Sequence, residues 1–180
     1  PDTELPYGRS MIRVAGDGFL AIEQVAFTDL GAPNNLVHLQ SHARATVASS
    51  SHTGIDVGNR GLYRMDSRAS LEITDSHFAS IETTVTQPYE LGVLLTSTLP
   101  DHLVLSNIEV RNAATVAGAA LFKVQLANAS SAPARFEDVT VESSGRVLIA
   151  DGHPVELVRQ RWVDAARSDP GPDAAHRYTT

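Results

Sequence analysis

Residues 70–80 read SLEITDSHFAS, and this stretch sets out a spacing that recurs along most of the chain. Its four inward points and the small polar residue after them are Leu71, Ile73, Ser76, Phe78 and Ser80. Alternation at period two places side chains on one face of a strand, so each pair of points predicts a short strand. The wider step between the second and third points bends the chain and keeps the same side facing inward, much as a β-bulge does. We therefore predict two short strands joined by a bend.

The same five-point template fits five further segments. They begin at residues 20, 45, 103, 134 and 155, which with the copy at 71 gives steps of 25, 26, 32, 31 and 21 residues. The second copy is degenerate, because it places polar residues at inward points. The points are Leu20, Ile22, Val25, Phe27 and Asp29; Ala45, Val47, Ser50, His52 and Gly54; Leu103, Leu105, Ile108, Val110 and Asn112; Ala134, Phe136, Val139, Val141 and Ser143; and Val155, Leu157, Gln160, Trp162 and Asp164.

A second inward pair precedes each copy. In five copies its second member lies six residues before the first template point. These pairs are Ile12 and Val14, Val37 and Leu39, Tyr63 and Met65, Leu95 and Ser97, and Val147 and Ile149, whereas Val124 of the pair Phe122 and Val124 lies ten residues before its template point. No single copy can bury its own apolar face, so a continuous core requires neighbouring copies to stack. The spacing predicts an all-β chain, a right-handed parallel β-helix solenoid of about five to six turns.

Two structural predictions follow from this fold. Equivalent points should pair in parallel, with Leu71 beside Leu103 and Leu103 beside Ala134, whereas an antiparallel sandwich of short strands would pair them through hairpins. The inward points should be buried, and Phe78→Ala should cost about 3–5 kcal/mol of stability. The residues expected to be buried are Leu20, Ile22, Phe27, Leu71, Ile73, Phe78, Leu103, Leu105, Ile108, Val110, Phe136, Val139 and Val141.

The two ends of the chain are interpreted separately. Residues 1–10 are expected to be an N-terminal extension or the end of a preceding region, and residues 11–164 the parallel β-helix. For residues 155–165 two alternatives stay open, a sixth turn or a capping helix that starts after Pro154, because Val155, Val158, Trp162 and Ala165 also share a helical face. Residues 165–180 contain Asp169-Pro-Gly-Pro172 and are expected to be a tail or linker.

Three stretches carry a resemblance to a known family. The run Ser70–Phe78 resembles the turns of the pectin-lyase-like right-handed parallel β-helix superfamily. Residues 110–121 and 61–65 are similar to turns of repetitive surface adhesins built on that fold. The resemblance covers about residues 11–164. It implies a fold and no single activity, because the superfamily includes polysaccharide lyases and hydrolases, phage tailspikes and adhesins.

The composition of the chain limits the classes of partner that it could bind. The net charge is −7 and no basic run of five or more exists, which argues against nucleic acid as a partner. No apolar stretch approaches the roughly 18 residues that span a bilayer, so we expect no membrane insertion. The absence of cysteine excludes disulfides and thiolate metal sites. We expect an extracellular or surface-exposed location, including a virion or appendage, and, because the chain begins at Pro1, a piece of a longer protein.

One outward face offers an acidic groove. Stacked turns would bring together the candidate residues Glu72, Asp75, His77, Glu109 and Asp138. Two carboxylates beside a sugar bond act as acid and base, and under the lyase alternative such a groove could hold Ca²⁺. The same alignment also places an opposite charge beside several of these residues, which is typical of a solvated, charge-matched surface. Four pairs are predicted, namely His77 with Glu109, Arg111 with Glu142, Asp138 with Arg159, and Arg135 with Glu156.

The seven histidines are interpreted as ordinary surface and corner residues. His38 and His42 are four residues apart, a spacing that favours metal ligation only on a helix, and the segment has a strand and turn pattern. We therefore predict no metal site and no cofactor.

Three functions remain open on these grounds. The first is a non-catalytic structural or adhesive module within a larger surface, appendage or tail assembly, with other protein chains and glycans as the expected partners. The second is a carbohydrate-active enzyme, a polysaccharide lyase or glycoside hydrolase, or a fragment of one. The third is a trimeric phage tailspike or capsid component. The missing catalytic motifs and the absence of clustered Asp pairs favour the first function.

Overall fold

The computed structural model describes residues 10–31, 34–57, 61–83, 92–113, 119–126, 132–142, 146–163 and 176–179. In this part of the chain the regular elements are strands, with no helix. They are β1 (Ser10–Val14), β2 (Phe19–Glu23), β3 (Ala26–Thr28), β4 (Asn35–Leu39), β5 (Arg44–Ala48), β6 (Ser51–Val57), β7 (Tyr63–Met65), β8 (Ser70–Thr83), β9 (Gly92–Thr98), β10 (His102–Arg111), β11 (Ala120–Gln125), β12 (Ala134–Glu142), β13 (Leu148–Asp151), β14 (Val155–Val158), β15 (Arg161–Val163) and β16 (His176–Thr179).

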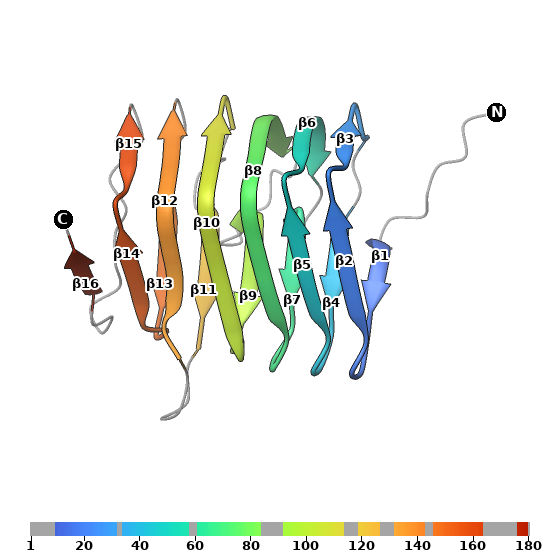
Figure 1. Ribbon diagram of the computed structural model, residues 1–180, viewed down its shortest axis with the longest axis horizontal. Helices are drawn as coiled ribbons and strands as arrows, with labels where there is room; N and C mark the ends of the chain where they lie inside the picture. The colour runs from blue at the N-terminus through green and yellow to red at the C-terminus, as the bar shows by residue number, and fades with distance from the viewer. Residues whose placement is uncertain are drawn as a thin grey trace.

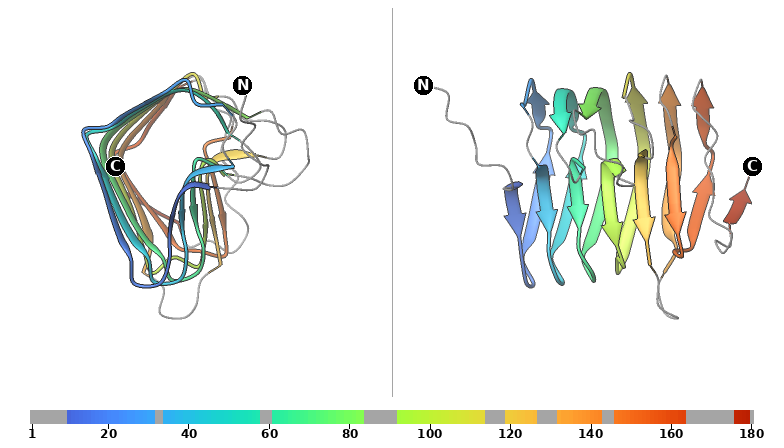
Figure 2. Two further views of the ribbon diagram at one scale, coloured as in Figure 1. Left: turned by 90° about the vertical axis from the view of Figure 1, so that its right-hand side faces the viewer. Right: turned by 180° about the vertical axis from the view of Figure 1, so that it is seen from behind.

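The strands form two parallel sheets. A six-stranded sheet has the order β1-β4-β7-β9-β11-β13. A ten-stranded sheet has the order β16-β14-β12-β10-β8-β5-β2, with β3, β6 and β15 paired beside this path. The strands of each sheet succeed one another along the long axis of the molecule (Figure 1), and in the end-on view they lie behind one another (Figure 2, left). Every strand pair among the described residues is parallel, so the antiparallel sandwich is wrong for this part of the chain.

The register follows the template. Leu71 pairs with Leu103, and Leu105 pairs with Phe136, as equivalent points should. The outward residues between these points align in the same way. One complete column, paired link by link, runs through Ala26, Ser51, His77, Glu109, Thr140 and Arg161.

The bends of the template have left-handed backbone conformations. At the bend between the second and third points, φ lies between 48° and 55° in all six copies, at Gln24, Ser49, Asp75, Asn107, Asp138 and Arg159. The fifth point also has positive φ in the four copies where it is described, at Asp29, Gly54, Ser80 and Asn112. Asp, Asn and Gly adopt this conformation more readily than most residues, which explains the small polar residue at the end of each template copy. Ser143 and Asp164 lie outside the described residues.

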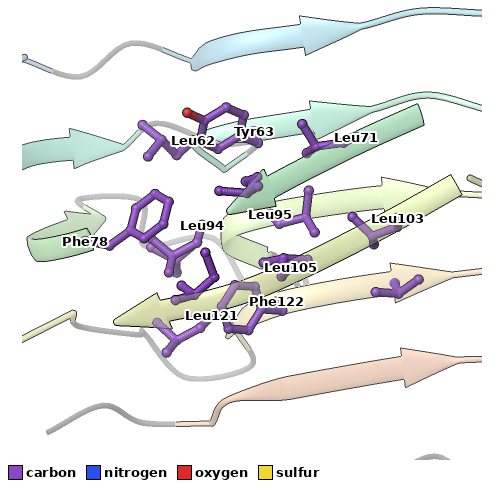
Figure 3. Packing of buried hydrophobic residues seen from close by; sticks show 14 of the residues in the cluster. Leu62, Tyr63, Leu71, Phe78, Leu94, Leu95, Leu103, Leu105, Leu121 and Phe122 are labelled. Atoms are coloured by element: carbon purple, nitrogen blue, oxygen red, sulfur yellow. The ribbon is translucent and has the colours of Figure 1, made fainter. Parts of the chain in front are cut away.

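The interior is filled by the inward points. Eleven of the thirteen residues expected to be buried are buried, and Figure 3 shows several of them packed between the strands. Leu20 and Phe27 are only half-buried, because they lie on β2 and β3 at one end of the ten-stranded sheet, where each strand has a neighbour on one side only. The template did not identify a further buried column on the strands of the six-stranded sheet or just before them, formed by Leu36, Leu62, Leu94 and Leu121.

The strands near the C-terminal end test two predictions, the capping helix and the position of the last inward pair. Residues 155–163 form β14 and β15, which pair with β12, so the capping helix is wrong for these residues. The inward pair before this copy is shifted by one residue: Leu148 and Ala150, not Val147 and Ile149, pair with Phe122 and Val124. The connection from Ala150 to the first template point is one residue shorter than expected, with a left-handed Gly152 at the corner.

The predicted end segments are described only in small part. Ser10 is the one described residue of the N-terminal extension, residues 1–10, and it begins β1. Of the predicted tail, residues 165–180, only His176–Thr179 is described, and it forms β16, which pairs in parallel with β14.

Candidate functional site

The predicted acidic groove lies on the outer face of the ten-stranded sheet. Glu72 and His77 are on β8, Glu109 is on β10, and Asp75 and Asp138 occupy left-handed bend positions of β8 and β12. The structure brings His77 and Glu109 together, with Nδ1 and Oε2 3.0 Å apart. Asp75 instead accepts a hydrogen bond of 2.7 Å from Asn107, and exposed Glu72 has no polar side-chain partner among the described residues. The five candidates therefore do not converge on one point.

Glu109 is the centre of a charged chain across three strands. Its other oxygen accepts a hydrogen bond of 2.7 Å from Arg111 Nε, and Arg111 in turn lies 3.8 Å from Glu142. Partial burial alone would raise the pKa of Glu109, but Arg111 and His77 together hold it below its ordinary value. A general acid needs a raised pKa, so this carboxylate is poorly suited to that role.

A second network joins β12 to β14 and the following bend. Arg135 contacts Glu137 at 3.0 Å and Glu156 at 2.9 Å. Arg159 contacts Glu137 at 2.6 Å and Asp138 at 2.7 Å. Hydrogen bonds from the two arginines lower the pKa of Glu137, and those from Arg159 lower the pKa of Asp138. With these contacts, all four opposite-charge pairs predicted from the alignment are present.

A polar cluster on the six-stranded sheet was not anticipated. His38, largely buried, lies 2.9 Å from Asp66 through Nε2, and Arg64 contacts the second carboxylate oxygen at 3.1 Å. Burial would raise the pKa of Asp66, but His38 and Arg64 outweigh that effect and lower it. The signal in the sequence is the position between the paired inward points, which holds Arg13, His38 and Arg64 in successive copies.

His52 is the clearest departure from the expected surface histidines. Its exposed fraction is 0%, and its ring stacks between Phe27, at a centroid distance of 5.0 Å, and Phe78, at 4.5 Å. Nε2 lies 2.7 Å from the Tyr63 hydroxyl, and Nδ1 has no hydrogen-bond partner. Burial lowers the pKa of His52 to about 4, against a weaker opposing effect of the His77 backbone.

Two other histidines are also buried, so the surface interpretation is wrong for three of the seven. His38 is 9% exposed, and His153 is 1% exposed with Nδ1 donating to the Leu126 carbonyl at 2.7 Å. For His52 a signal existed in the sequence, because it stands at the fourth template point, where Phe27 and Phe78 stand in the neighbouring copies.

A shallow cavity lies beside β6 and the C-terminal end of β8. Its volume is about 260 Å³, and it is lined by Gly54, Ile55, Asp56, Ser80 and Glu82. Within the described ranges no group of three histidine or acidic side chains is arranged to hold a metal ion. This cavity differs chemically from the groove pair of His77 and Glu109, because its lining contains two carboxylates, Asp56 and Glu82, and no basic side chain.

Comparisons with protein-family models, curated proteins and solved structures find no match for this chain. No helix in the described part is long and apolar enough to cross a membrane. Evidence on function therefore comes from the side chains themselves.

Proposed function

We propose that the chain is a right-handed parallel β-helix of the pectin-lyase-like kind, and that it serves as a non-catalytic structural or adhesive rod. Support for the fold comes from the all-parallel pairing, the template register and the left-handed bends that recur at equivalent points. A solenoid of this kind buries a continuous core and presents a long, regular outer face.

The observation that carries the functional proposal is the pairing of carboxylates with basic side chains on the outer face. Glu109, Glu137 and Asp138 are each paired with a basic residue, and the pKa of each is lowered. Ionised, paired carboxylates stabilise a surface slightly and are poor proton donors. A face built in this way is suited to holding a shape rather than to acid catalysis.

The aromatic side chains favour the same proposal over carbohydrate chemistry. Sugar-binding clefts use exposed aromatic faces to stack on the sugar ring, but Phe78, Phe122, Phe136 and Tyr63 are buried. Among the described side chains only Phe19 is an exposed aromatic, at 62%, and it lies on β2 at the end of the sheet. On the described surface a glycan would therefore be bound mainly through polar contacts.

The proposal includes a setting. The rod belongs to a larger surface, appendage or tail assembly outside the cell or on a virion, and its partners are other protein chains and glycan surfaces. It requires no cofactor. A trimeric tailspike or capsid component is the variant of this proposal in which three rods associate side by side.

The test is an incubation of the 180-residue chain with a broad polysaccharide panel, with and without Ca²⁺. Released reducing ends and unsaturated ends are both measured. We expect no release above a heat-inactivated sample in either condition. Turnover that is lost in Asp75→Asn or Glu109→Gln and kept in the matched surface variant Glu23→Gln, at an exposed residue of β2, would replace the structural proposal with the enzymatic one.

A further inference from the structure

The first three strands form a weakly secured end of the described chain. We call β1, β2 and β3, within residues 10–31, the N-terminal strand triplet. Each of the three pairs with one strand only, β4, β5 and β6 respectively. The apolar side chains that the triplet contributes are only partly buried, namely Ile12, Val14, Leu20, Phe27 and Leu30, and three others are exposed, namely Met11, Phe19 and Val25. Segments with few buried apolar contacts open locally before the rest of a protein unfolds.

His52 is the contact through which the core reaches this triplet. From β6 its ring covers the face of Phe27 on β3, and on its other side it covers Phe78 on β8. The pairing between β3 and β6 covers only Ala26–Thr28, so the stacked rings supply much of the apolar contact at this place. The fully buried ring therefore links a loosely held segment to the centre of the core.

We propose that His52 is an acid-sensitive latch, which holds the N-terminal strand triplet on the core while its ring is neutral and releases the triplet when the ring is protonated. The proposal goes beyond the function as a rod, because it gives one end of that rod a response to pH. Opening would uncover the edges of β4, β5 and β6, together with the apolar side chains beneath Phe27.

The surroundings of the ring do not accommodate a positive charge. A protonated imidazole has two N–H donors, and only Nε2 makes a hydrogen bond, to the Tyr63 hydroxyl on β7. The backbone of His77 favours the charged form, but its effect is weaker than that of burial. The other titratable group that acts on the ring is His77 on β8, whose electrostatic effect disfavours a positive charge on His52. β3 and β8 otherwise present Phe27 and Phe78, which are uncharged. Stacking on two phenyl rings offsets only part of the cost of burying the cation.

Three backbone amides report on the release directly. Arg44, Ser51 and Asp56 donate hydrogen bonds to carbonyls of the triplet, those of Gly18, Val25 and Leu30, at 2.9, 3.0 and 3.1 Å. Leu121 and Phe122, near the other end, donate to Arg146 and Val147 and serve as internal controls.

The experiment is amide hydrogen exchange on the 180-residue chain at pH 7.5 and pH 5, corrected for intrinsic exchange rates. The pKa of His52 is about 4 in the folded chain, and its ordinary value of 6.5 is the upper limit in the open state, so the opening equilibrium should rise by up to about 30-fold at the three reporter amides. The control amides should keep their protection. His52→Phe, which completes a column of three phenyl rings, should abolish the rise, and the matched surface variant His102→Phe, at an exposed histidine of β10, should retain it.

Two results would overturn the proposal. One is equal opening of the reporter amides at both pH values in the wild type. The other is an acid response of His52→Phe as large as that of the wild type. Should Phe at position 52 prevent folding, His52→Leu places a smaller neutral side chain at the same point and must give the same loss of acid response.

Discussion

His52 replaces a phenyl ring in a buried aromatic column, and its neutral form is the one that the fold accepts. Burial lowers its pKa to about 4, whereas the unfolded chain has the ordinary value near 6.5. Between these values the unfolded state binds the proton more tightly, so stability falls as the pH falls. We expect the free energy of unfolding to decrease by about 2 kcal/mol between pH 7.5 and pH 5. Urea denaturation at the two pH values measures it, and His52→Phe should lose far less.

The carboxylates should contribute little to the difference in free energy of unfolding between pH 7.5 and pH 5. The pKa values of Asp66, Glu109, Glu137 and Asp138 are lowered by basic neighbours. The stability that such groups contribute is present above their unfolded pKa and is lost as the pH falls through their folded pKa, which lies below the ordinary carboxylate value. A loss between pH 7.5 and pH 5 that is equal in the wild type and in His52→Phe would therefore assign the effect to other histidines.

At the scale of the elements, the bend between the second and third template points depends on a left-handed residue. Ser49 is exposed, has φ of 50°, and makes no side-chain hydrogen bond among the described contacts, so it isolates the backbone contribution. Ser49→Gly should keep or slightly raise stability, because glycine adopts this conformation without steric cost. Ser49→Val should lower it by about 1–2 kcal/mol, because a side chain with a branched Cβ clashes there.

Thermal or urea denaturation of the two variants measures the difference. Ser51→Val, two residues later on β6, is the matched control, since Ser51 lies in a strand that accepts β-branched residues. If Ser49→Val and Ser51→Val have the same stability, the left-handed bend is not what the template spacing encodes.

The strands themselves were predictable because inward points recur in register. Period-two alternation and the fixed step between Ile73 and Ser76 are properties of the backbone, and they placed Leu71 beside Leu103 correctly. Outward pairs such as Arg135 with Glu156 followed from the same register. The one-residue shift at Ala150 was not predictable from alternation, because both alternating sets of residues there are apolar and both are buried.

The buried polar groups were harder to predict than the core. A histidine is polar in any composition count, and only its place in the column of Phe27 and Phe78 indicates that it is buried. The cluster of His38, Arg64 and Asp66 depends on residues that lie beside the template rather than on it. Side-chain chemistry away from the repeated points is set by local contacts, which a spacing rule does not contain.

At the scale of the whole molecule, each strand set contacts only its neighbours, so the two ends should respond separately to substitution. Trp162 is the only tryptophan and lies on β15, far along the ladder from β2 (Figure 1). Leu20 is half-buried on β2, and Leu105 is fully buried at the centre of the ten-stranded sheet. A cavity at the centre interrupts stacking on both sides, whereas a cavity at the end affects one neighbour.

We therefore expect different behaviour of two leucine truncations under urea. In Leu105→Ala the transitions followed by far-ultraviolet circular dichroism and by Trp162 fluorescence should shift together to lower urea, with a loss of about 2–5 kcal/mol. In Leu20→Ala the loss should be smaller, and the circular dichroism transition should begin at lower urea than the Trp162 transition, because the N-terminal strands unfold first. Coincident transitions in both variants would mean that the ladder unfolds as one cooperative unit, and stacking energy would then have to be shared along its whole length rather than between neighbours.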